Sequence, residues 1–165
     1  MPFVIGDDDT LLHPEFREAG AALASLVCAC RRSLWLRVPE LDALTADRQV
    51  CEAIKALALS SERVDIRIQY DNQENAVRNG HRLIHLARRL PSRIQLRQSQ
   101  YDDQDNQQCF AIGDRTGLFE ASGWPRPGRI DLCAHRLPRA PRLARQFQEE
   151  WERASASPEL RELRL

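Results

Sequence analysis

The sequence has a single lysine, Lys55, among 24 basic residues, so nearly every positive charge is an arginine guanidinium. A guanidinium can bind phosphate or carboxylate through two parallel hydrogen bonds. The 24 acidic residues cancel the basic ones, so the formal net charge is zero. The chain therefore has no global field that would attract nucleic acid or an anionic membrane.

The sequence also lacks a cysteine pair with the spacing of a metal or redox motif. Its five cysteines are odd in number, and no two of them form a C-x-x-C pair. They are Cys28, Cys30, Cys51, Cys109 and Cys133. We expect free, mostly buried thiols in a cytoplasmic protein, with no metal and no other cofactor.

Long apolar runs are absent as well. The longest, residues 19–30, is too short to span a bilayer, and no early stretch has the pattern of a secretory signal. We therefore expect no contact with a membrane. What is present is ordinary globular composition, with 42% hydrophobic and 29% charged residues. A chain of 165 residues fits one domain, with a short N-terminal segment at 1–14 and a tail at 154–165.

Hydrophobic periodicity predicts helices and strands in alternation. Helices are expected at 15–32, 46–59, 74–90 and 138–153, and strands at 33–38, 63–70, 93–98 and 129–134, with a hairpin at 107–119. In the first helix Phe16 should face inward and Arg31 and Arg32 should lie at the C-terminal end, while Pro39 should stop the strand that follows. This order predicts an α/β fold with a mixed, mainly parallel sheet flanked by helices.

The hairpin is built around the turn Gly-Asp-Arg-Thr-Gly at 113–117. Asp114 should bond its own turn backbone there, as aspartate often does. In the last expected helix, Leu143, Phe147 and Trp151 recur at i, i+4 and i+8. Such a stripe is typical of core packing or of a dimer face.

Several segments form a recognisable combination: residues 80–84 (Gly-His-Arg-Leu-Ile), 86–94 (Leu-Ala-Arg-Arg-Leu-Pro-Ser-Arg-Ile), 110–117, the Phe147 and Trp151 pair, and 158–161 (Pro-Glu-Leu-Arg). Together they resemble one half of a phospholipase D enzyme, in a bacterial branch of phospholipase D-like domains. The resemblance covers most of the chain and implies the same α/β fold. By resemblance, such a domain can dimerise through its hairpin face.

Active members of that family carry the motif H-x-K-x-x-x-x-D on the strand that enters the hairpin. Anchored on Asp114, the histidine position falls on Gln107 and the lysine position on Cys109. A glutamine amide cannot act as the nucleophile, and a neutral thiol cannot replace an ammonium group opposite phosphate. The resemblance therefore implies a fold that has lost its catalytic residues, and we predict no catalytic residue in this chain.

A second group of candidates lies on the expected helix at 74–90. His81 and His85 are four residues apart, a spacing that lets two imidazoles share a ligand, and Arg82 and Arg88 lie beside them. Without the glutamate of an H-E-x-x-H motif, metal binding is poorly supported. Contact with an anion or ligand and simple packing both remain open for these residues.

We accordingly expect a non-catalytic binding, regulatory or protein-interaction module. Its partner would be a second copy or another protein, and a phosphorylated ligand is a further option. One alternative is a phosphodiesterase or nuclease with a displaced site drawn from His81, His85, His135 and Cys109. Another is a nucleic-acid-binding accessory protein that uses the basic start of the last helix, although we expect no nucleic-acid partner.

Overall fold

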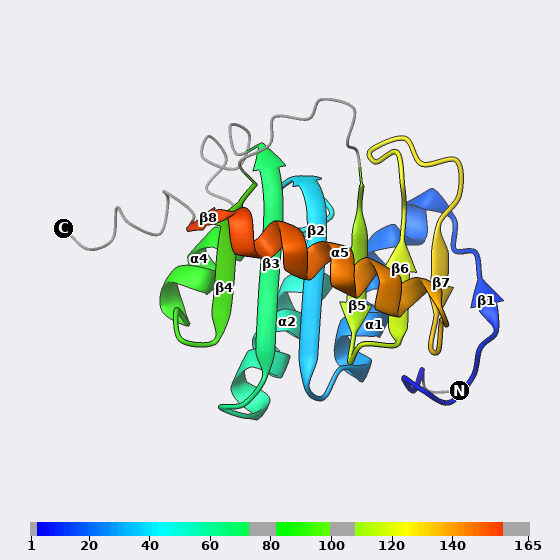
Figure 1. Ribbon diagram of the computed structural model, residues 1–165, viewed down its shortest axis with the longest axis horizontal. Coiled ribbons are helices and arrows are strands. Elements are labelled where there is room, and N and C mark those ends of the chain that lie inside the picture. Colours follow the sequence, from blue (N-terminus) through cyan, green and yellow to red (C-terminus); the bar gives the residue numbers. More distant parts are fainter. Residues whose placement is uncertain (1–2, 73–81, 100–107, 157–165) are drawn as a thin grey trace.

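The computed structural model describes residues 3–72, 82–99 and 108–156 of the chain. These residues form one eight-stranded sheet, with helices on both faces (Figure 1). The strands are β1 (Leu11–Leu12), β2 (Ser33–Glu40), β3 (Asp65–Asn72), β4 (Ile94–Gln98), β5 (Phe110–Gly113), β6 (Gly117–Glu120), β7 (Asp131–Cys133) and β8 (Ser155–Ala156). The helices are the short 3₁₀ turn η1 (Phe16–Glu18), α1 (Ala19–Ala29), α2 (Arg48–Ser60), α4 (Arg82–Arg89) and α5 (Arg139–Arg153).

The strand order is β1-β7-β6-β5-β2-β3-β4-β8. Strands β2, β3 and β4 run parallel, and α2 lies between β2 and β3 in the chain. All other neighbours pair antiparallel. The expected mixed α/β sheet flanked by helices is confirmed, but its parallel part is limited to three strands. Strands β5, β6 and β7 follow one another without an intervening helix, and connections of this length join antiparallel rather than parallel neighbours.

One face of the sheet is apolar and packs against α1 and α2. Alternate residues of the central strands point to this side, among them Leu36 and Ile68, and they join Leu23 and Ile54 of the helices in one buried cluster. The hairpin fits closely under α1, because a Cβ added to Gly113 would lie 2.7 Å from the Cys30 sulfur. Glycine is therefore required where the hairpin meets this helix.

In the described part of the chain, a single helix, α5, crosses the other face of the sheet (Figure 1). Leu143, Phe147 and Trp151 are buried against it, so the predicted stripe packs in the core. The Phe147 ring stacks on Trp35 of β2 at 5.3 Å between centroids, and on Trp151 at 5.6 Å. Aromatic stacking thus anchors α5 to the sheet.

The structure corrects three details of the element boundaries. Helix α1 ends at Ala29, before Arg31 and Arg32, which lie in the connection to β2. Phe16 lies outside α1 and is 57% exposed, with its ring stacked on Trp124. Strand β2 continues through Pro39, because β5 pairs with it only as far as Arg37, and no ladder hydrogen bond is lost.

The helix expected at 74–90 is seen as α4 for Arg82–Arg89, and residues 73–81 lie outside the described part. The five cysteines are free, as expected; three are buried, while Cys28 is exposed and Cys51 half-buried. Within the described residues, no helix has the length and apolar character needed to cross a membrane.

Candidate functional site

The parallel strands β2, β3 and β4 end at one edge of the sheet, the place where open α/β sheets usually bind ligands. Arg37 lies near the end of β2 and is 1% exposed. Its Nε is 3.1 Å from Glu150 Oε2 on α5. Its Nη2 lies 3.0 Å from Asp71 Oδ1 and donates to Oδ2 at 3.2 Å. We call Arg37, Asp71 and Glu150 the Arg37 cluster.

The charge of this cluster limits what it can bind. One guanidinium faces two carboxylates, and its Nη1 is also used, donating to the Val38 carbonyl at 3.0 Å. Burial raises the pKa of Asp71, while Arg37 opposes that rise and Glu150 adds to it. With both carboxylates ionised the cluster has an excess negative charge, so it is unsuited to a phosphate group.

Amide side chains surround the Arg37 cluster. Gln146 donates to Gln108 Oε1 at 2.6 Å and to Glu150 Oε1 at 3.3 Å. Gln98 donates to the Asp71 carbonyl at 3.0 Å. Gln69 is fully buried, and neither of its amide atoms has a hydrogen-bond partner among the described residues. Burying an amide without a hydrogen-bond partner costs free energy. Together, these amide side chains make the face of the sheet beneath α5 polar.

Cys109 immediately precedes β5 and is fully buried. Its side chain belongs to the apolar cluster beneath α1 and α2, whereas the next residue, Phe110, lies opposite Arg37 on the α5 side. Burial raises the pKa of the Cys109 thiol, with a smaller contribution from Asp42 in the same direction and an opposing one from Arg37. The thiol is therefore protonated near neutral pH and poorly suited to nucleophilic attack.

Asp114 lies in the turn between β5 and β6, with φ of 46°. Its carboxylate accepts hydrogen bonds from the backbone N–H groups of Arg31 at 2.9 Å, Arg32 at 2.7 Å and Ser33 at 3.0 Å. The expectation that it bonds its own turn was wrong, because its partners lie more than 80 residues away in the chain. Asp114 ties the hairpin to the start of β2.

Asp114 and Cys109 lie at opposite ends of β5. Gly113 pairs with Leu34 near the start of β2, and Phe110 pairs with Arg37 near its end. These two pairs are three positions apart along the strand, which corresponds to about 10 Å at 3.3 Å per residue. The two positions of the degenerate motif that are described therefore do not converge on a common site, and Gln107 lies outside the described residues.

The helical candidates lie on the other side of the sheet from the Arg37 cluster. Helix α4 buries Leu83, Ile84, Leu86 and Ala87 in the same core as α1 and α2, and leaves His85 and Arg82 exposed. Arg88 is half-buried on this helix. His81 lies outside the described residues, so its relation to His85 stays a prediction.

His135 follows β7 and is half-buried, and its Nδ1 has no hydrogen-bond partner among the described residues. The next residue, Arg136, donates its N–H to the Thr116 carbonyl, which places His135 near the hairpin turn. Cys109 is at the far end of that hairpin. No three metal-binding side chains of the described part are grouped in a way that could hold a metal ion.

The Arg37 cluster was not predicted from the sequence. One signal was available, because Arg67, Gln69 and Asp71 occupy alternate positions on β3. The residues between them are apolar and buried, so this strand presents a polar face to the side that α5 covers. An ion pair among residues 37, 71 and 150 joins distant parts of the chain, and spacing alone does not reveal it.

Comparison with known proteins identifies solved structures of similar fold. No curated protein matches the chain. Among solved structures, Nuc from Salmonella typhimurium, described as a phospholipase D family member, is 16% identical with a TM-score of 0.64, and the match covers 91% of this chain and 97% of that one. NucT from Helicobacter pylori is 18% identical with a TM-score of 0.66, covering 91% and 99%.

A third similar structure is TrmBL2, described as an archaeal chromatin protein with a novel mode of DNA binding. It is 13% identical with a TM-score of 0.61, covering 93% of this chain and 55% of that one. At such identities the likeness concerns the fold, which is that of phospholipase D family members. A family model matches residues 15–163, and the chain belongs to that family, described as Domain of unknown function (DUF7931).

Proposed function

We propose that this domain is a non-catalytic phospholipase D-like module that acts by binding a protein partner. The observation that supports this proposal is the environment of the Cys109 and Asp114 side chains. The thiol is buried in the apolar core, and the carboxylate is occupied by three backbone N–H groups of the chain itself. Neither side chain is available to a substrate. The five free thiols favour a reducing compartment such as the cytoplasm.

Phosphate-containing ligands receive less support. The Arg37 cluster has an excess of carboxylates, and the basic first half of α5 is followed directly by Glu149, Glu150 and Glu152. A phosphate backbone following this helix would meet repulsion after about two turns. One similar structure is described as DNA-binding, so a nucleic-acid titration at low and high salt is a useful second assay. Binding to nucleic acid should weaken steeply with salt.

The experiment that tests the proposal is hydrolysis of an activated phosphodiester by the purified protein. Cys109→Ala, His85→Ala and His135→Ala, together with His81→Ala, are assayed beside it. We expect no turnover above buffer in any sample. Turnover that one of these replacements abolishes would overturn the proposal and support a displaced active site.

A further inference from the structure

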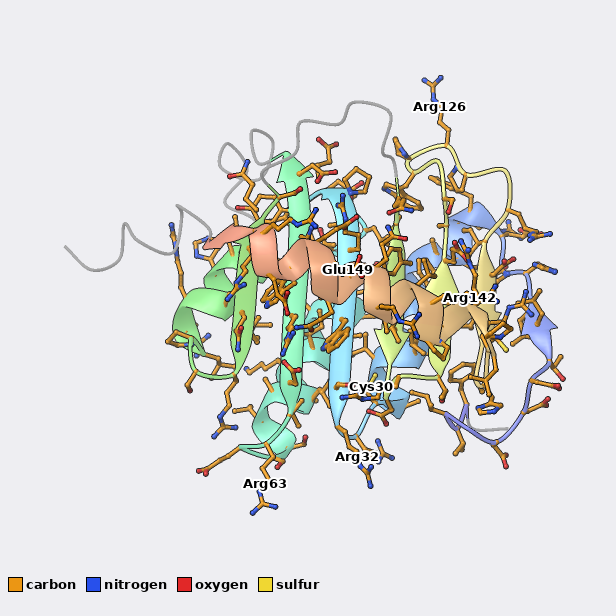
Figure 2. The ribbon with its side chains drawn as sticks, viewed as in Figure 1. Cys30, Arg32, Arg63, Arg126, Arg142 and Glu149 are labelled. Carbon is orange, nitrogen blue, oxygen red and sulfur yellow. The ribbon has the colours of Figure 1, made fainter. Side chains whose placement is uncertain are left out.

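Exposed charges of both signs lie along α5, which ends in the exposed Arg153. Arg142 and Arg145 lie in the first half, and Glu149 and Glu152 lie in the second. Successive spacings of three, four and three residues place all four on one face of the helix, opposite the buried Leu143, Phe147 and Trp151. We call the four residues the α5 stripe. All of them are exposed, and Figure 2 labels Arg142 and Glu149 at two points along the helix.

The stability of the helix does not explain this arrangement. The N-terminal end of a helix dipole favours acidic side chains and the C-terminal end favours basic ones, whereas the α5 stripe has the reverse order. Within the described residues, the side chains of Arg142, Arg145 and Glu149 form no hydrogen bond or ion pair. Glu152 only accepts a hydrogen bond from Gln148, at 3.2 Å. The stripe charges are therefore available to a partner.

A second copy of the same helix, running antiparallel, matches these charges. When two α5 helices are related by a two-fold axis near residue 147, Arg142 faces Glu152 of the partner subunit. In the same register Arg145 faces Glu149 of the partner subunit. Symmetry repeats both contacts, which gives four ion pairs. A parallel arrangement would instead place arginine against arginine and glutamate against glutamate.

The surface beside the stripe has room for such a partner. No other helix of the described part covers this face of the sheet (Figure 1). A groove of about 690 Å³ runs along α5, and Arg145, Glu149 and Glu152 line one side of it. Trp35, Arg67 and Arg115 are also in its wall, residue types that are enriched at protein interfaces.

We propose that the α5 stripe is a two-fold interface, and that its occupant is a second copy of this chain with α5 antiparallel to α5. This inference rests on the proposed function, since it names the protein that the module binds. The contact is isologous, so each copy contributes the same surface and the assembly closes as a dimer. Because the matching groups are exposed charges, the association should weaken as salt is added.

Charge reversal tests the register directly. Arg142→Glu/Arg145→Glu makes the stripe entirely acidic, and Glu149→Arg/Glu152→Arg makes it entirely basic. In sedimentation velocity over a range of concentrations at low salt, we expect wild-type dimers and a dissociation constant at least about 100-fold weaker for either variant alone. An equal mixture of the two variants should form a heterodimer, because every antiparallel contact then joins opposite charges.

A fourth protein carries all four substitutions. It should dimerise like the wild type and melt at a higher temperature, since its charges agree with the helix dipole. This variant protects the test against a double variant that fails to fold. The matched control is Arg63→Glu/Arg126→Glu, which reverses two exposed arginines far from α5 (Figure 2). We expect this control to keep the dimer.

Three results would overturn the inference. The first is a wild type that is monomeric at every concentration, as expected if another segment of the same chain covers the stripe. The second is double variants that dimerise as well as the wild type. The third is a mixture of the two double variants that gives no heterodimer. Failure of the proposed function is distinguishable from these results, because it appears as phosphodiester turnover whatever the oligomeric state.

Discussion

The two faces of the sheet differ in both composition and cover. The face under α1, α2 and α4 is an apolar core in which Leu36 and Ile68 are fully buried. The face under α5 combines aromatic anchors with charged groups, and among the described residues only one helix crosses it. Adjacent residues of β2, Leu36 and Arg37, point to opposite faces. Hydrophobic packing is therefore more extensive on the first face, whereas the second combines a smaller aromatic cluster with charges that hydrophobic packing does not require.

The largest expected effect comes from Arg37→Met. The substitution leaves Asp71 and Glu150 partly buried without their cation, so it should lower the free energy of unfolding by about 3–5 kcal/mol. The combined variant Arg37→Met/Asp71→Asn/Glu150→Gln should recover most of this loss, because no uncompensated charge remains. Urea unfolding monitored by circular dichroism measures both.

The neighbouring residue provides the control for the opposite face. Leu36→Ala should cost about 2–5 kcal/mol through a cavity, and neutralising Asp71 and Glu150 should not restore it. If the neutralised combination at Arg37 stays as unstable as Arg37→Met, the ion pairs are not the reason for the loss. The contrast between the two faces would then be wrong.

Asp114→Ala should have a smaller effect. It removes the acceptor of three backbone N–H groups between α1 and β2, so we expect a loss of about 1–3 kcal/mol. Asp114→Asn should lose less, because one side-chain oxygen remains and asparagine tolerates the positive φ of this turn. The same unfolding assay is used. An Asp114→Ala protein as stable as the wild type would show that the carboxylate does not hold the hairpin in place.

Local patterns predicted most of the elements. The alternation in β3 and the i, i+4, i+8 stripe of α5 were visible in the sequence, because a buried face repeats with the period of its element. The early end of α1 was not visible in the sequence, since it coincides with the backbone contacts of Asp114, which lies more than 80 residues away. The prediction that Pro39 ends the strand was wrong for a related reason. Whether β2 can contain a proline at this position depends on where β5 stops pairing with it.

The candidate site was less predictable than the fold. The resemblance directed attention to Cys109 and Asp114, and sequence alone could not show that one is buried in the core and the other bonded to a distant backbone segment. The Arg37 cluster depends on side chains from β2, β3 and α5 meeting in space. Such a meeting depends on strand order, which was not fixed by any local pattern.

The smallest expected effect is a change in how stability depends on pH. Burial raises the pKa of Asp71, so the folded protein holds this proton more tightly than the unfolded chain, in which the pKa is about 3.9. Ionisation of Asp71 therefore lowers the free energy of unfolding as the pH rises above that value. Asp71→Asn removes this contribution, and its stability relative to the wild type should increase as the pH rises above the unfolded-state pKa of Asp71.

Asp8 supplies a control of opposite sign on an exposed segment of the chain. Its side-chain hydrogen bond with Thr10 lowers the pKa of Asp8, so its ionised form is favoured in the folded state, and this stability is lost as the pH falls. The stability of Asp8→Asn relative to the wild type should therefore decrease as the pH rises. Urea unfolding at several pH values measures both variants. Parallel profiles for Asp71→Asn and the wild type would mean that the carboxylate is not desolvated beneath α5, and that this face is wetter than its burial indicates.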